Sequence, residues 1–454
     1  MKKTFLKSLM VALGVLLSVH ANADENGVLI EGVYYNLITL TKTATVVNGG
    51  TKYTGEVTIP ASVNHEGEDY TVHTIVMEAF KNCTGLTAVN IPSSVSTISD
   101  QAFYGCSGLT SVTIPDGVTS IGNEAFRYCS NLATVVIGDD VKTIGNNAFE
   151  GCYALTEVTL GKRVETIGGW AFYYCNNLPS IAIPRSVTFF GNRAFESCYR
   201  LTAVHITDLA AWCGVMAGGE CANPLYVAEH LYLNGAEVKD LVIPDGVKTI
   251  NNGAFENCQG LRAVTIPKSV TNIKNKAFRN CSNLNTVNIE GNGTIIGSYA
   301  FYDSNNLNTL NITGSITSLG EYAFNGCNRL NKVDITDLAA WCKMTVNAYS
   351  NPLDYAGQLW VNGTKITNLV IPNGVTTINE GVFSQITGLK SVSIPSSVTS
   401  IGNASFQYCS NLESVSIPSS VTSIGANAFL NCTSLTQATL SNGIKTIGGS
   451  AFSG

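Results

Sequence analysis

The sequence has few charged residues. Asp, Glu, Lys and Arg make up 13% of its 454 residues, about half of the usual ~25% of a soluble domain. The formal net charge is −6, and the acidic and basic residues are scattered along the chain. No basic stripe indicates nucleic-acid binding, and a hydrophobic content of 45% argues against disorder. A chain of this length is expected to form several domains or a repeat array.

The motifs of familiar enzymes are also missing. The sequence has no HExxH, GxSxG, P-loop or GxGxxG motif, and no CxxC pair that would indicate a zinc site. Beyond the N-terminal segment, the histidines are His65, His73, His205 and His230, and they form no catalytic or ligand pattern. Asp139-Asp140 is a carboxylate pair, but we expect it to fill a turn. We therefore predict a protein that is not an enzyme and that uses no metal or cofactor.

A long apolar run occurs only at the N-terminus. Lys2 and Lys3 precede a mostly apolar stretch, and Ala21-Asn22-Ala23 fits the small-residue cleavage rule. This pattern predicts a cleavable signal peptide over residues 1–23 and export of the protein; an uncleaved anchor is the alternative. No second apolar stretch of ~20 residues follows, so the mature chain is not expected to span a membrane.

Phenylalanine recurs with a fixed period through most of the chain. Within each of three series, successive phenylalanines are 23 residues apart. The series are Phe80, Phe103, Phe126, Phe149, Phe172 and Phe195; Phe255, Phe278, Phe301 and Phe324; and Phe383, Phe406, Phe429 and Phe452. A period of about 20–29 residues with Leu, Val and Ile at set offsets is typical of a leucine-rich solenoid.

Each position of the repeat has a physical role. One unit, residues 109–131, reads LTSVTIPDGVTSIGNEAFRYCSN. Val112 and Ile114 alternate inward on a short strand, which the following proline ends because it cannot donate to a ladder. We expect Gly122 to lie in a turn that needs positive φ, and Phe126 to fill the far side from a short helical turn. One unit cannot bury its apolar residues alone, but stacked units can.

The unit LxxVxIPxxVxxIGxxAFxxC resembles the BspA-like leucine-rich-repeat family of bacterial surface proteins, over nearly all of the mature chain. The resemblance implies a repeat solenoid: a leucine-rich-repeat array of 23-residue units with a parallel β-sheet face, short helical turns opposite and an N-terminal β-cap. We expect the β-cap over residues 24–75 and the solenoid over residues 76–454. The pattern is specific for the fold and weak for function, because such arrays serve many partners.

The octapeptide ITDLAAWC occurs twice, at Ile206–Cys213 and Ile335–Cys342. Each copy lies where the phenylalanine series breaks, so each break holds one overlong repeat, at about residues 201–237 and 330–365. The Asp of the octapeptide is a natural N-cap for a short helix. An Asn-Gly pair later in the overlong repeat predicts a hairpin turn. We interpret the octapeptide as structural, with its Trp covering apolar surface.

The alternative is that the overlong repeats carry recognition. The loops around residues 214–222 and 343–350 differ between the two copies, and insertions in repeat proteins often project from the surface and bind partners. Tyr226, Tyr349 and Tyr355 lie in or near these loops, and their convergence on one groove would favour glycan binding.

The chain has 14 cysteines, which in a secreted protein can indicate disulfides. Those three residues after the repeat Phe are Cys83, Cys106, Cys129, Cys152, Cys175, Cys198, Cys258, Cys281, Cys327, Cys409 and Cys432. In-register cysteines ~4.8 Å apart point the same way and are too far apart for bridges. We therefore expect a ladder of small buried thiols. A disulfide between Cys213 and Cys221 is left as an alternative.

The outward positions of the strands form the candidate binding face. We expect one continuous sheet, with small, polar and almost uncharged side chains on its outer surface. The residues of this face are Ser111, Thr113, Thr134, Glu157, Thr159, His205, Thr265, Asn288, Asn311, Lys332, Asp334, Ser391 and Ser393. Such a face serves as a platform for a large partner; the alternative is that it only keeps the strands soluble.

Two functions follow from this face and from the family resemblance. The first is a secreted or cell-surface adhesion protein, bacterial by that resemblance, which binds a host or extracellular-matrix protein. The second is a carbohydrate-binding or cell-envelope scaffold module. The sequence shows neither the partner nor a surface anchor. It stops at Gly454, where a third overlong repeat would begin, so we expect either a covering partner or a longer natural chain.

Overall fold

A computed structural model describes residues 27–454, so the expected signal peptide lies outside the described residues. The chain divides into two compact units. The first unit ends at His205 and also takes in Gly218–Ala228; the second comprises Ile206–Ala217 and Glu229–Gly454. Each unit is a stack of similar turns of chain, which we call coils, and each regular coil carries a first strand and a shorter second strand.

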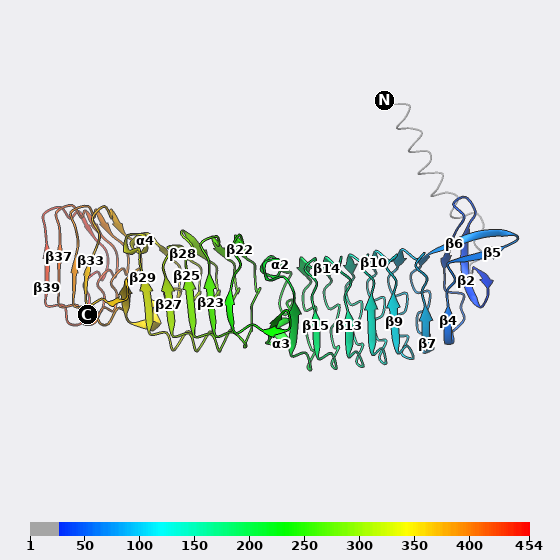
Figure 1. Ribbon diagram of the computed structural model, residues 1–454. Helices are drawn as coiled ribbons and strands as arrows, with labels where there is room; N and C mark the ends of the chain where they lie inside the picture. Colours follow the sequence, from blue (N-terminus) through cyan, green and yellow to red (C-terminus); the bar gives the residue numbers. More distant parts are fainter. Residues whose placement is uncertain (1–26) are drawn as a thin grey trace, which may run out of the picture. The chain divides into compact units, whose positions relative to one another are not determined.

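The first unit begins with antiparallel strands (Figure 1). β1 (Val28–Ile30), β2 (Val33–Ile38) and β3 (Thr43–Val46) form a meander, and β5 (Ser62–His65) forms a hairpin with β6 (Glu68–Ile75). β3 then pairs in parallel with β6, which leads the row of second strands. The antiparallel strands are thus joined directly to the solenoid by parallel pairing.

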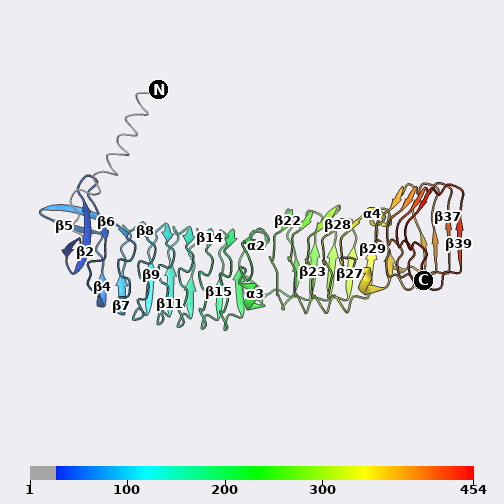
Figure 2. The ribbon, with the colours of Figure 1, turned by 180° about the vertical axis from the view of Figure 1, so that it is seen from behind.

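The coils of the first unit follow in register, and their strands lie side by side in Figures 1 and 2. The first strands are β4 (Thr54–Thr58), β7 (Gly85–Asn90), β9 (Ser111–Ile114), β11 (Thr134–Ile137), β13 (Glu157–Thr159), β15 (Ser180–Ala182) and β17 (Ala203–Ile206). The second strands after β6 are β8 (Thr97–Ile98), β10 (Ser120–Ile121), β12 (Thr143–Ile144), β14 (Thr166–Ile167) and β16 (Phe189–Phe190). This unit also contains α3 (Leu225–Ala228).

The second unit has the same organisation around two overlong repeats. It starts with α2 (Leu209–Cys213), β18 (Met216–Ala217) and the hairpin β19 (Leu231–Leu233)–β20 (Ala236–Glu237). The first strands are β21 (Asp240–Val242), β23 (Ala263–Ile266), β25 (Thr286–Ile289), β27 (Thr309–Ile312), β29 (Lys332–Ile335) and β31 (Leu359–Val361), which ends in a hairpin with β32 (Thr364–Lys365). A separate sheet contains β33 (Asn368–Val370), β35 (Ser391–Ser393), β37 (Ser414–Ile417) and β39 (Gln437–Leu440).

The second strands of this unit form two further sheets. One contains β22 (Thr249–Ile250), β24 (Asn272–Ile273), β26 (Thr294–Ile296), β28 (Ile316–Leu319) and β30 (Thr345–Val346); the other contains β34 (Thr377–Ile378), β36 (Ser400–Ile401), β38 (Ser423–Ile424) and β40 (Thr446–Ile447). The helices α4 (Leu338–Lys343) and α5 (Leu353–Ala356) belong to the second overlong repeat. Within residues 27–454, no helix is long and apolar enough to cross a bilayer.

The core follows the repeat pattern. Val112 of β9 pairs with Val135 of β11, both are buried, and the polar residues between the apolar positions face out. The repeat phenylalanines stack: the Phe126 ring lies 4.9 Å from that of Phe103 and 5.3 Å from that of Phe149, with nearly parallel planes. A parallel-strand solenoid of 23-residue coils is therefore confirmed.

The turns opposite the sheet differ from the expected short helices. In each regular coil two residues flanking the Phe adopt positive φ, such as Glu124 (φ 56°) and Tyr128 (φ 60°). These residues turn their N–H groups toward the next coil: Glu124 N donates to Asn146 O and Tyr128 N to Glu150 O, both at 2.8 Å. The turn edge is therefore hydrogen-bonded from coil to coil. In an α-helix these N–H groups would instead bond to carbonyls of the same segment.

The explanation expected for Gly122 was wrong. Gly122, Gly145 and Gly168 do not have positive φ. Instead, a Cβ on Gly145 would lie 2.6 Å from the backbone N of Asn123 and the carbonyl carbon of Gly122 in the preceding coil. The glycine is needed because the two backbones approach too closely for any side chain.

The expectation of one continuous sheet was also wrong. β9, β11 and β13 form one sheet, and β15 and β17 belong to another. Ala133 N donates to Thr110 O (2.8 Å) and Thr156 N to Ala133 O (2.9 Å), but the next position of this series is Pro179. Proline has no N–H, so the ladder is interrupted between β13 and β15.

Candidate binding groove

The predicted face residues all point away from the core and are exposed or half-buried. Ser111, Thr113, Thr134, Glu157 and Thr159 lie on the sheet β9-β11-β13 of the first unit. His205 is half-buried on β17, and Ser391 and Ser393 lie on β35 of the second unit. The structure does not bring these residues into a common site.

Four of the predicted residues do share a site on the second unit. Thr265, Asn288, Asn311 and Asp334 occupy the same outward position on β23, β25, β27 and β29. They line a groove of about 440 Å³ together with Glu290, Thr313, Thr336, Asn362 and Gly363. We call this site the amide groove. Its volume falls in the range of small-ligand sites, about 300–1,000 Å³.

Two coils of the groove have a residue followed by glycine where other coils have an Ile-Pro corner. Here the strands end in Ile289-Glu290-Gly291 and Ile312-Thr313-Gly314. A Cβ on Gly314 would lie 2.1 Å from the carbonyl oxygen of Gly291, so the corners stack backbone on backbone with no side chain between them.

The row of amides is fixed by hydrogen bonds. Asn288 Nδ2 donates to Thr265 Oγ1 (3.3 Å), and Asn311 Nδ2 donates to Asn288 Oδ1 (2.9 Å). An Asn side chain offers two N–H donors and an acceptor oxygen. Each amide therefore keeps one N–H, and Asn311 keeps its Oδ1, for hydrogen bonds with a ligand.

Asp334 is held at the end of this row. Its Oδ1 accepts from Gly363 N (3.0 Å) in the β31–β32 turn, and its Oδ2 lies 2.9 Å from Lys332 Nζ. Lys332 Nζ also lies 5.1 Å from the centroid of the Trp360 ring, and Trp360 is the register partner of Asp334. The carboxylate is thus a pre-oriented acceptor next to an aromatic side chain.

Glu290 is the other carboxylate of the groove. It is half-buried, and among residues 27–454 it forms no ion pair. No Lys or Arg lines the groove, and the Lys332 ammonium is already paired with Asp334. The electrostatics of the groove therefore disfavour anionic ligands.

The lining of the groove contains no histidine and no cysteine. Its hydroxyls have no neighbouring general base of the serine–histidine type. Across the described residues, no group of three or more His, Cys, Asp or Glu side chains could hold a metal ion. The lining of the groove offers several hydrogen-bond donors and acceptors to a ligand.

A His–carboxylate pair occurs elsewhere in the second unit. His230 Nδ1 lies 2.7 Å from Glu237 Oε1, and Lys239 Nζ lies 3.1 Å from Glu237 Oε2. Hydrogen bonds from His230 and Lys239 lower the pKa of Glu237. The hollow around this pair is lined otherwise by amides, Arg262 and a glycine, with no Ser, Thr, Cys or Tyr to act as a nucleophile.

The carboxylate pair Asp139-Asp140 has a structural role. Lys162 and Arg163 of the next coil each lie 2.6 Å from one of the two carboxylates.

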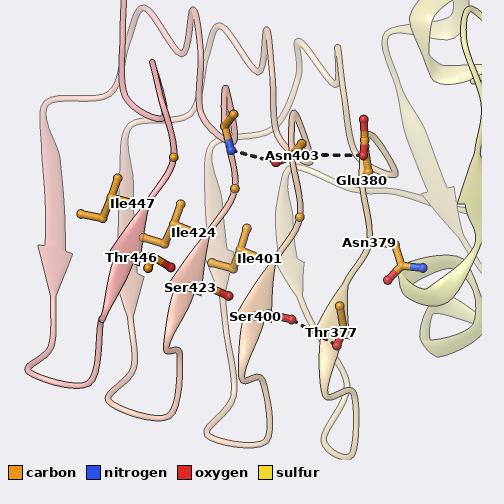
Figure 3. A pocket seen from close by; sticks show the side chains of 14 residues that line it. Thr377, Asn379, Glu380, Ser400, Ile401, Asn403, Ser423, Ile424, Thr446 and Ile447 are labelled. Carbon is orange, nitrogen blue, oxygen red and sulfur yellow. Dashed lines mark hydrogen bonds between the residues drawn. The ribbon is translucent and has the colours of Figure 1, made fainter.

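A third hollow, of about 530 Å³, follows the second strands β34, β36, β38 and β40 (Figure 3). Thr377, Ser400, Ser423 and Thr446 form a row of hydroxyls along it, and Ser400 Oγ donates to Thr377 Oγ1 (3.2 Å). The glycines of the close backbone approach make it shallow. Glu380 is its one charged lining residue, so it offers less chemistry than the amide groove.

The ITDLAAWC segments have the structural role expected of them. Asp208 and Asp337 accept hydrogen bonds from Ala211 N (2.9 Å) and Ala340 N (2.8 Å), as N-caps. The indole N–H of Trp212 donates to Ala254 O (2.9 Å). That of Trp341 donates likewise to Val382 O (2.8 Å), and both rings are buried.

Part of the loop of the second overlong repeat, which the alternative interpretation expected to project, belongs to a sheet. Residues 345–346 form β30, which pairs with β28 and continues the sheet of second strands. Tyr349 is 65% exposed, but its ring stacks on Tyr322 (5.3 Å), which stacks on Tyr299 (5.2 Å), along the turn edge. Tyr355 is half-buried instead, and neither Tyr349 nor Tyr355 lines the amide groove. The aromatic strip itself was missed, although each of its first two members lies two residues before a repeat Phe.

The cysteines form the expected ladder of thiols. All 14 are free, including Cys213 and Cys221, so these two cysteines form no disulfide. Burial raises the pKa of most ladder thiols, to about 12 for Cys106 and Cys198. Thiols held in this state are poor nucleophiles and poor metal ligands.

Sequence reasoning missed five residues of the groove lining and Trp360. The signal was present in the sequence: the coils at Glu290 and Thr313 replace the Ile-Pro corner with a residue followed by glycine. That a tryptophan of β31 lies beside Asp334 depends on the register of an overlong repeat, which the 23-residue period does not give.

The repeat of this chain also occurs in known proteins. The family model of the BspA type leucine-rich repeat region matches six copies, over residues 71–208, 226–351 and 358–454. No curated protein matches the chain.

Solved structures of bacterial repeat proteins are also similar. A leucine-rich repeat protein from Bacteroides ovatus is 24% identical with a TM-score of 0.44, over 94% of this chain and 92% of that one. A leucine-rich cell surface protein from Faecalibacterium prausnitzii is 25% identical with a TM-score of 0.37, over 91% and 94%. The pneumococcal vaccine antigen PcpA is 18% identical with a TM-score of 0.38, over 91% and 98%. With its repeat, its parallel coils and the match to the family model over most of its length, the chain belongs to the BspA type leucine-rich repeat family.

Proposed function

We propose that this protein is a non-catalytic adhesion protein that is exported, remains outside the cell and binds a large protein partner across its strand faces. Bacterial surface repeat proteins of this type are generally interaction scaffolds. The supporting observation is the outward surface of the first strands, where small polar side chains recur at a fixed spacing, as at Ser111, Thr134 and Glu157 in register. Such a surface makes many modest contacts with a partner, and none of them requires deep burial.

The test is direct binding of the purified chain to a panel of extracellular-matrix and host-surface proteins. In one variant, four face residues of the first unit become lysine: Ser111, Thr113, Thr134 and Thr159. In a matched control, four exposed residues away from the first-strand faces become lysine: Thr119, Asn131, Thr143 and Thr188. We expect saturable binding that the face variant loses and the control keeps. Equal binding by both variants would place the site elsewhere.

A carbohydrate-binding role is the second candidate, and one observation favours it. The amide groove combines fixed amides, two carboxylates and a neighbouring tryptophan in a volume suited to a small ligand. A cell-envelope scaffold, the other form of this candidate, would bind glycan through the same groove without a host partner.

A further inference from the structure

We propose that the amide groove binds a neutral oligosaccharide, through hydrogen bonds from its hydroxyls to the Asn288–Asn311 row and to the carboxylates of Asp334 and Glu290. This inference specifies the ligand of the second candidate function and is independent of the first. It rests on the pattern of donors and acceptors, the charge of the groove and its size.

The donors and acceptors alternate as a sugar requires. A sugar hydroxyl donates one hydrogen bond and accepts others, so neighbouring hydroxyls need a donor beside an acceptor. Asn288 and Asn311 each retain one free N–H after the ladder bonds, and Asn311 retains its Oδ1. The ladder fixes the plane of both amides before the ligand arrives, which reduces the entropy lost on binding.

Two carboxylates supply strong acceptors in the groove. Asp334 is oriented by Gly363 N and Lys332, and Glu290 lies two coils away, just after the end of β25. Hydrogen bonds to charged acceptors are roughly twice as strong as neutral ones. The same charges repel sulfated or uronic-acid sugars, because no lining Lys or Arg offsets them. The ligand is therefore neutral.

Trp360 gives the groove an apolar neighbour. Its ring is half-exposed beside Asp334, with the Lys332 ammonium 5.1 Å from the ring centroid. The buried Nε1–H of Trp360 has no acceptor among the described residues. The C–H face of a pyranose is the apolar surface that an indole can contact.

The alternatives fit the groove less well. A protein interface of standard size buries roughly 800 Å² on each partner around an apolar centre, whereas this lining contains no large hydrophobic side chain. A basic peptide would pair with Glu290 but would leave the ordered amides unused. Peptide binding is therefore kept as a competing outcome of the test.

The test uses the whole chain, displayed in many copies because multivalency offsets weak single-site affinity. The probes are neutral hexose and N-acetylhexosamine oligosaccharides, sulfated and uronic-acid oligosaccharides, and a Lys/Arg-rich peptide. We expect binding to at least one neutral probe and none to the acidic ones. The best probe is then titrated against the chain, with tryptophan fluorescence and a Trp360→Phe variant to assign the signal.

The variants locate the site. Asn288→Ala combined with Asn311→Ala is expected to weaken binding at least tenfold. Asn90→Ala removes an equally outward, exposed Asn on β7 and is expected to change nothing. Thermal melts confirm that both proteins remain folded. The proposal fails if the folded chain binds no neutral probe, if only the peptide or acidic sugars bind, or if the double variant binds as well as the parent. Loss of matrix-protein binding has no bearing on these outcomes.

Discussion

The Sγ of Cys152 lies 3.3 Å from the carbonyl oxygen of Phe126, 26 residues earlier in the chain. Cys106 with Phe80, Cys129 with Phe103 and Cys175 with Phe149 repeat this contact in neighbouring coils. The thiol is therefore a donor to the preceding coil as well as a small core residue. The position is chemically tolerant, since Ser304 takes it in one coil and donates to Phe278 O at 3.2 Å.

The first prediction concerns this contact. Cys152→Ser is expected to change the free energy of unfolding by less than about 1 kcal/mol, because the hydroxyl makes the same bond. Cys152→Ala removes the thiol contact and the volume of the sulfur, while Cys129 N still donates to Phe126 O (3.2 Å), and it is expected to cost about 1–2 kcal/mol. Chemical denaturation of both variants measures the difference. Serine no better tolerated than alanine would show that the sulfur acts only by its volume.

The second prediction concerns the phenylalanine stack. Phe126→Ala removes a fully buried ring between Phe103 and Phe149, and we expect it to cost about 3–5 kcal/mol. Thr113→Ala changes an exposed side chain on the same coil and is expected to stay within about 0.5 kcal/mol. Equal shifts of the unfolding midpoint would contradict the inward assignment of Phe126.

The third prediction separates two reasons for glycine. Gly145→Ala places a Cβ against the backbone of the preceding coil and is expected to cost about 1–3 kcal/mol. Gly374 has φ 88° and open space around its Cα, so Gly374→Asn is expected to cost less, because Asn tolerates that conformation. Thermal unfolding compares them, and the reverse ranking would refute the close-approach argument.

The fourth prediction concerns the buried indole of the second overlong repeat. Trp341→Phe keeps an aromatic ring but removes the hydrogen bond to Val382 O. The buried carbonyl is left without its partner, and we expect a loss of about 1–3 kcal/mol. Trp212→Phe, which removes the bond to Ala254 O, serves as the parallel case. Measured by urea denaturation, unchanged stability in both variants would show that the indole N–H contributes nothing.

The fifth prediction is a pH dependence. Asp354 accepts from Ser384 Oγ (2.7 Å), and burial raises its pKa above the usual 3.8. The folded protein therefore holds this proton more tightly than the unfolded chain does. As the pH rises from 3.8 through the raised pKa, native stability is lost, because a buried carboxyl must ionise.

Asp354→Asn keeps an acceptor for Ser384 and removes that ionisation. We expect the variant to melt higher than the parent at pH 7 and level with it near pH 3. Ser393→Ala, on an exposed strand position, is the control and should show no pH-dependent difference. A variant that is destabilised at pH 7 but level with the parent near pH 3 would show that the carboxylate is needed in its charged form.

The repeat position of Gly122 shows what the repeat pattern alone does not predict. Asn251 and Asn379 stand at the repeat position that Gly122 and Gly145 occupy in other coils. In the structure neither residue has positive φ. Asn379 Nδ2 donates to Lys343 O (2.7 Å) at the end of α4, and Asn251 Nδ2 donates to Gly214 O (2.7 Å) after α2. Each Asn follows an overlong repeat, where a helix end replaces the close backbone approach.

For the amide groove, the sequence predicts the direction of the side chains but not the contacts between them. The outward direction of Asn288 and Asn311 follows from the alternation of a strand. Their bond to each other, the depth of the groove and the position of Trp360 do not, since each depends on how separate coils stack.

The sequence by itself determined the coil. Its 23-residue period, its inward Val, Ile and Phe positions, the thiol ladder and the capped Trp helices are all local patterns repeated many times, and repetition makes a local preference unambiguous. Only the tertiary structure decided the backbone contacts between glycines, the break of the ladder at Pro179 and the groove on β23–β31. The physical reason is that these features lie between coils. Their geometry is set by the packing of residues 23 or more positions apart, which no single repeat encodes.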